Sequence, residues 1–65
     1  MLTFNDLTLP CPEGLTLAQL LDERSMDPDT IATAVNGRFV AATARPGIKL
    51  ADGDRIEVVA PMQGG

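Results

Sequence analysis

Side chains that could carry out chemistry are few in this sequence, and the only thiol among its 65 residues is Cys11. There is no His to activate it, and a single Cys forms neither an internal disulfide nor a Cys-rich zinc site. Cys11 alternates with Leu7 and Leu9, which predicts that all three lie on the core face of a strand. We therefore interpret Cys11 as a small buried hydrophobe.

The charged residues exclude further classes of function. Nine acidic residues against five basic ones give a net charge of −4, which argues against nucleic-acid binding because phosphate backbones need clustered Lys and Arg. Asp52 and Asp54 flank Gly53 as in a calcium loop, but the rest of that loop is absent, so we expect a solvated turn and no metal site. Four scattered basic residues are interpreted as solvated surface: Arg38, Arg45, Lys49 and Arg55. The chain is a poor candidate for an enzyme.

The ending Gly64-Gly65 is the feature most suggestive of chemistry. One interpretation is a frayed terminus, since chain ends are often disordered. The other is that the terminal carboxylate is itself a substrate that enters a narrow channel in another protein, because a backbone without Cβ permits close approach. A carboxylate resists nucleophiles until one oxygen becomes part of a leaving group, as in an acyl adenylate made from ATP. The glycine pair alone leaves both interpretations open.

The elements that would carry this ending begin with two short strands. Residues 2–5 and 7–12 alternate apolar and polar side chains, and Asn5-Asp6 between them supplies turn chemistry, which predicts a β-hairpin. Two prolines in the second stretch cannot donate ladder hydrogen bonds, so we expect that strand at an edge of the sheet.

A helix follows the hairpin. Thr16 and Gln19 form a capping box, which predicts a helix over residues 17–24 that ends before Pro28. Its apolar stripe consists of Leu17, Leu20 and Leu21. Because so short a helix is unstable alone, we expect it to pack on a sheet.

The second half of the chain predicts three more strands. Asn36-Gly37 joins residues 31–35 to 38–40, because both central positions of a type I′ turn need positive φ. Phe4 and Phe39 are expected as the large fillers of an otherwise aliphatic core.

Residues 41–50 are less legible, with Ile48 and Leu50 expected in the core. The β-branched run 55–60 predicts the last strand, with Ile56 and Val58 facing inward.

Together these elements predict an α+β fold, a mixed sheet of about five strands in the order β-β-α-β-β-β packed on one short helix. We expect one domain over residues 1–60 and a flexible tail over residues 61–65.

The whole chain resembles the ubiquitin-like β-grasp sulfur carriers, and among them the small carriers of thiamine biosynthesis. The resemblance covers essentially all 65 residues. It is carried by the element order and by four short stretches: Phe4-Asn5-Asp6, Ala34-Val35-Asn36-Gly37, Asp52-Gly53-Asp54 and Pro61-Met62-Gln63-Gly64-Gly65.

The resemblance implies a mechanism. An E1-like adenylyltransferase uses ATP and magnesium to convert the Gly65 carboxylate to an acyl adenylate, and sulfur from a persulfide enzyme displaces AMP to leave a thiocarboxylate. Thiazole synthase then receives that sulfur. The tail residues that thread into the partners' active sites are Pro61, Met62, Gln63 and Gly64. The carrier binds no cofactor itself and contributes no catalytic residue.

Alternation places Val59 on the face opposite Ile56 and Val58, where we expect it to be exposed beside the tail and to contact the activating enzyme. A strand former on a solvated face is the simpler alternative for Val59.

Other functions remain open: the small subunit of molybdopterin synthase, another sulfur carrier or a modifier conjugated to lysines, and a non-covalent β-grasp binding module.

The sequence also predicts where the protein works. We see no signal peptide, and the longest apolar run, residues 58–62, is far below the roughly 20 residues that a membrane span needs. A reducing cytoplasm suits a chain with one Cys, and we expect no membrane partner.

Overall fold

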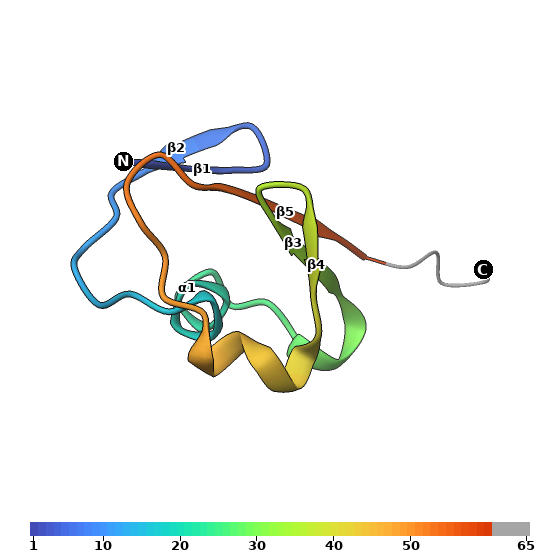
Figure 1. Cartoon of the computed structure of the whole chain (residues 1–65). Coiled ribbons are helices and arrows are strands. Elements are labelled where there is room, and N and C mark those ends of the chain that lie inside the picture. The colour runs from blue at the N-terminus through green and yellow to red at the C-terminus, as the bar shows by residue number, and fades with distance from the viewer. Residues whose placement is uncertain (61–65) are drawn as a thin grey trace.

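Five strands, one α-helix and two 3₁₀ helices make up the computed structural model, which describes residues 1–60 (Figure 1). The strands are β1 (Leu2–Phe4), β2 (Leu7–Leu9), β3 (Ala32–Val35), β4 (Arg38–Val40) and β5 (Arg55–Val59). The helices are α1 (Leu17–Glu23), η1 (Pro28–Thr30) and η2 (Ala42–Gly47). This order confirms the predicted β-β-α-β-β-β pattern.

The strands form one mixed sheet in the order β2-β1-β5-β3-β4. β1 and β5 run parallel, and the other neighbouring pairs are antiparallel. Figure 1 shows α1 and η2 on the same side of the sheet. The opposite side carries no helix of the described chain. The strand register places the exposed Phe39 and Val59 side chains on that opposite side.

The core lies between the sheet and α1. Ile56 and Val58 face inward as predicted, Leu50 is buried, and Ile48 is partly buried against the same cluster. The buried apolar side chains are Leu2, Phe4, Leu15, Leu17, Leu20, Leu21, Val40, Leu50, Ile56 and Val58. Every buried side-chain nitrogen or oxygen within residues 1–60 has a hydrogen-bond partner, so the core carries no unpaired polar side chain there.

The first hairpin has the predicted edge strand but corrects the placement of Leu7. Leu7 is the register partner of Phe4, so both point to the helix side of the sheet. However, β2 is the edge strand and Leu7 adjoins the turn, which leaves its side chain 49% exposed rather than in the core. Leu9 and Cys11, further along the chain, are partly buried against the core.

The helix α1 has both predicted capping bonds. The Thr16 hydroxyl accepts from the backbone N–H of Gln19 at 3.1 Å, and the Gln19 side chain accepts from the N–H of Thr16 at 3.0 Å. None of the helices within residues 1–60 is long and apolar enough to cross a lipid bilayer.

The helix ends one residue earlier than predicted, in a left-handed cap. Ser25 has φ of 58°, and its N–H donates to the Asp22 carbonyl while the N–H of Met26 donates to the Leu21 carbonyl. These two bonds define a Schellman motif, whose left-handed position is usually Gly. Because Ser occupies it here, no glycine marks this cap in the sequence.

Arg45 corrects the prediction of a solvated basic residue. It lies in η2 and is only 4% exposed. Its guanidinium donates to Thr33 Oγ1 at 3.1 Å and to two backbone carbonyls, Pro28 O and Ile31 O, each at 2.9 Å. These bonds offset the cost of burying the charge, because they replace the water that the guanidinium loses. Arg45 therefore ties η2 to the chain entering β3.

Candidate functional site

The residues predicted to carry the chemistry lie outside the described part of the chain, so their roles stay predictions. They are Pro61, Met62, Gln63, Gly64 and Gly65. The same holds for the predicted tail boundary after residue 60. The structure does describe β5, the strand that leads directly into these residues.

β5 has a partner strand on each side over only part of its length. On one side, Thr3 and Phe4 of β1 lie opposite Arg55 and Ile56. On the other side, β3 accompanies β5 as far as Val59. Because β1 ends at Phe4, the last three residues of β5 have, within residues 1–60, a strand on one side only.

The Asn5 side chain occupies the place that β1 leaves. Its Oδ1 accepts from the Val58 N–H at 2.9 Å, and its Nδ2 donates to the Val58 carbonyl at 3.3 Å. Its own backbone N–H donates to the Ile56 carbonyl at 2.8 Å. Asn5 reaches this position with φ of 51°, a left-handed conformation that Asn tolerates better than most residues.

Asn36 holds the opposite end of β5 in a similar way. Its Oδ1 accepts from the Arg55 N–H at 2.9 Å, and its backbone N–H donates to the Arg55 carbonyl at 2.7 Å. Its Nδ2 donates to Asp54, whose other carboxylate oxygen accepts from the N–H of Ala51. Asp54 therefore stabilises the turn before β5, as the expectation of a turn at Asp52-Gly53-Asp54 implied.

An apolar surface adjoins the exit of β5 on the uncovered side of the sheet. Val59 is 63% exposed, as the alternation of the strand predicted. Register places Ala32 beside Val59 and Ala34 beside Phe39, and the four side chains line a shallow hollow together with Glu57. We call the set Ala32, Ala34, Phe39 and Val59 the open-face patch.

The prediction that Phe39 fills the core is wrong, because its side chain is 73% exposed. The turn at Asn36-Gly37 pairs Val35 with Arg38 and Thr33 with Val40, so Val40 points inward and Phe39 outward. The two-residue turn fixes this register, and the sequence could have revealed it. Hydrophobicity alone misassigned the residue.

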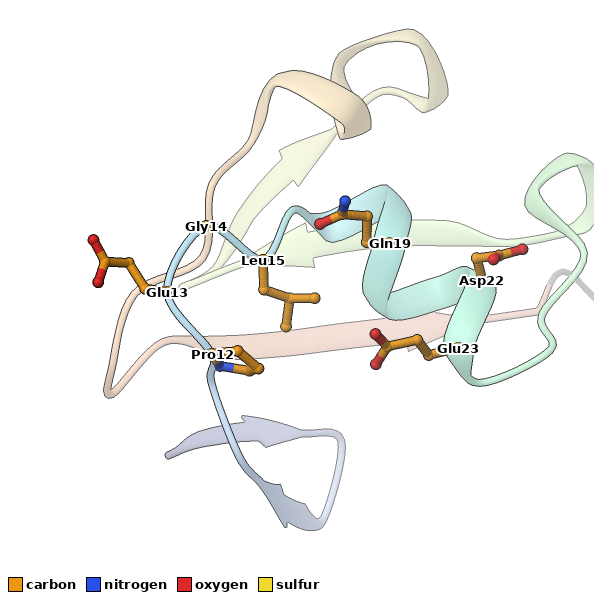
Figure 2. Close-up of a pocket in the computed structure, with 7 residues that line it drawn as sticks. All are labelled: Pro12, Glu13, Gly14, Leu15, Gln19, Asp22 and Glu23. Atoms are coloured by element: carbon orange, nitrogen blue, oxygen red, sulfur yellow. The ribbon is translucent and has the colours of Figure 1, made fainter.

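The acidic hollow beside α1 shows no comparable arrangement. Three carboxylates line it, those of Glu13, Asp22 and Glu23. Figure 2 shows Glu13 extending away from the helix that carries the other two. No group of three or more His, Cys, Asp or Glu side chains in residues 1–60 could hold a metal ion.

Comparisons with known proteins connect this fold to one family. The model of the ThiS family matches residues 2–65. The sulfur carrier protein ThiS of Thermus thermophilus is 40% identical over 53 residues, which cover 82% of this chain and 83% of that protein.

Two solved structures from Geobacter metallireducens are similar throughout. The crystal structure of its thiamine biosynthesis protein ThiS has a TM-score of 0.81 at 27% identity, covering 98% of this chain and 97% of that one. An NMR solution structure of a thiamine biosynthesis protein from the same organism has a TM-score of 0.78 at 27% identity, covering 98% and 86%.

Proposed function

The chain belongs to the ThiS family, and we propose that it is a sulfur carrier whose Gly65 carboxylate accepts the sulfur used for thiazole formation in thiamine biosynthesis. The observation that supports this most is that the family match extends through residue 65 and so includes Gly64 and Gly65. The fold supports it as well, because the last strand of the sheet ends at Val59, only five positions before Gly64.

The proposed chemistry takes place at one carboxylate. An oxygen of the Gly65 carboxylate attacks the α-phosphorus of ATP in an E1-like adenylyltransferase, which releases pyrophosphate and forms the acyl adenylate. The outer sulfur of a cysteine-derived persulfide on the partner attacks the acyl carbon and displaces AMP, which forms an acyl disulfide. A second thiol of the partner then attacks the partner's sulfur of that S–S bond, so that a disulfide forms on the partner and the thiocarboxylate is released for thiazole synthase. The partners supply magnesium and the catalytic groups, and the carrier acts as a cosubstrate.

The open-face patch is the proposed docking surface for the adenylyltransferase. Only Ala60 separates Val59 from the tail, so an enzyme that holds Gly65 in its active site must approach this end of β5. Exposed apolar patches on small domains commonly mark contact sites. The net charge of −4 adds the expectation of a relatively basic partner surface, with association slowed by salt.

The test of this function uses ATP–pyrophosphate exchange by the adenylyltransferase. A variant with one residue added after Gly65 should fold normally by circular dichroism yet support no exchange, because the reacting carboxylate has moved. The matched control adds the same residue before Met1, at the other end of the chain, and should retain exchange. Normal exchange by the variant extended after Gly65 would overturn the proposal.

The loaded protein also distinguishes the alternatives. Transfer of sulfur to thiazole synthase supports the thiamine carrier. Transfer only to the large subunit of molybdopterin synthase, or isopeptide bonds to lysines, would assign the same activated carboxylate to a different pathway.

A further inference from the structure

Two asparagines with nearly the same backbone φ secure the two ends of β5. Asn5 has φ of 51° and Asn36 has φ of 52°, and each lies in the turn of a β-hairpin. Each binds β5 through both its backbone N–H and its side-chain amide. They differ in which end they hold, since Asn36 contacts Arg55 at the start of the strand and Asn5 contacts Val58 near its exit.

The bonds from Asn5 complete the pairing of β5 where no strand is available. In a strand, the N–H and carbonyl of one residue point to the same neighbour. Those of Val58 point to the β1 side, where β1 has already ended, and both are bonded to the Asn5 amide. Without that amide, the N–H and the carbonyl of Val58 would lose their protein partners.

We propose that Asn5 is a positioning residue that fixes Val58 and Val59 and thereby sets the point from which the reactive end leaves the domain. The proposal rests on the proposed function. Residues 60–65 span at most about 20 Å when extended, so the position of Val59 limits where the Gly65 carboxylate can reach. The same end of β5 contributes Val59 to the open-face patch, so Asn5 positions part of that patch as well as the point where the chain leaves the sheet.

Loss of the hydrogen bonds between Asn5 and Val58 should weaken binding of the carrier to the adenylyltransferase rather than slow the chemical step. If the end of β5 frays in the free carrier, the adenylyltransferase must order it on binding. The conformational entropy lost in that ordering weakens association. Once the tail is bound, the enzyme itself sets the geometry of the reacting atoms. We therefore expect KM for the carrier to rise about tenfold, roughly the factor for ordering one backbone residue, with kcat nearly unchanged.

The experiment compares Asn5→Gly with Asn36→Gly. Gly accepts the left-handed φ at both positions, so each variant keeps its turn and loses only the side-chain amide. Both are assayed with the adenylyltransferase at a temperature where circular dichroism shows them folded, and amide hydrogen exchange is followed by NMR.

The expected pattern is specific to each end. Asn5→Gly should speed exchange of the Val58 amide about tenfold or more and raise KM, whereas Asn36→Gly should speed exchange of the Arg55 amide and leave KM close to the parent value. Asn5→Asp, which keeps the acceptor for the Val58 N–H, should restore much of the protection at Val58.

Several results would overturn the proposal. They are unchanged Val58 exchange in Asn5→Gly, faster exchange with an unchanged KM, or an equal rise of KM in both variants. If the parent chain is adenylated normally and Asn5→Gly has the same KM and kcat as the parent, the proposal for Asn5 is wrong while the proposed function stands. A parent chain that is not adenylated at all overturns the proposed function, and this proposal with it.

Discussion

Phe39 and Val59 flank the same stretch of β3 on the uncovered face of the sheet, with Ala32 and Ala34 between them. The small alanines leave a shallow hollow between two large exposed side chains, which is a shape that an apolar partner side chain can fill. The pair therefore gives the proposed docking surface two anchors, of which the alternation of β5 predicted only Val59.

Replacing either anchor should weaken docking without unfolding the domain. Phe39→Asp or Val59→Asp should leave the thermal melt almost unchanged, because both side chains are mostly exposed. Each should weaken binding to the adenylyltransferase by about 1–3 kcal/mol, as for a buried interface anchor, measured by calorimetry. Leu7→Asp is the matched control, an exposed apolar residue on the edge strand β2 that should bind normally. Normal binding by both anchor variants would place docking on another surface.

Arg45 should be essential for stability. Arg45→Met keeps much of the side-chain volume but leaves the Thr33 hydroxyl and the carbonyls of Pro28 and Ile31 without their donors. The free energy of unfolding should fall by about 2–5 kcal/mol, measured by urea denaturation. Arg38→Met, at an exposed position of β4, should change it by less than about 0.5 kcal/mol. Equal effects of the two substitutions would show that the buried hydrogen bonds of Arg45 contribute little.

The end of α1 offers a stabilising substitution. Ser25 has a positive φ, which costs an L-residue energy that Gly avoids. Ser25→Gly should therefore raise the free energy of unfolding by about 0.5–1 kcal/mol, since the gain exceeds the extra entropy of Gly in the unfolded chain. Ser25→Ala, which keeps the Cβ, should bring no gain. A loss of stability in Ser25→Gly would show that the Ser25 side chain itself stabilises the cap.

Local signals in the sequence were sufficient for most elements of the fold. The capping box at Thr16 placed the start of α1, the Asn-Gly turn placed the second hairpin, and alternation placed Ile56 and Val58 inward. Each of these signals depends on neighbours within a few residues, which is why it can be recognised without the fold.

Apart from Phe39, whose register the local Asn36-Gly37 turn determines, the predictions that failed depend on distant parts of the chain. Arg45 is buried because carbonyls from residues 28 and 31 and the Thr33 hydroxyl surround it, and nothing beside Arg45 in the sequence indicates them. Leu7 points to the core side yet is exposed because none of the described elements covers the edge strand there. The hydrogen bonds from the Asn5 side-chain amide to Val58 were missed for the same reason, since the two residues are 53 positions apart in the sequence.

Mass spectrometry of the intact carrier shows whether sulfur is carried on the Gly65 carboxylate. After incubation with the adenylyltransferase, ATP, magnesium and a persulfide donor, the intact mass should increase by the difference between one sulfur and one oxygen. Fragmentation should place that change at Gly65, and a folded Cys11→Ala variant should load equally well, since we propose that Cys11 has no part in the chemistry. An unchanged mass under conditions in which a known carrier is loaded, or sulfur found on Cys11 instead, would show that Gly65 does not carry the sulfur.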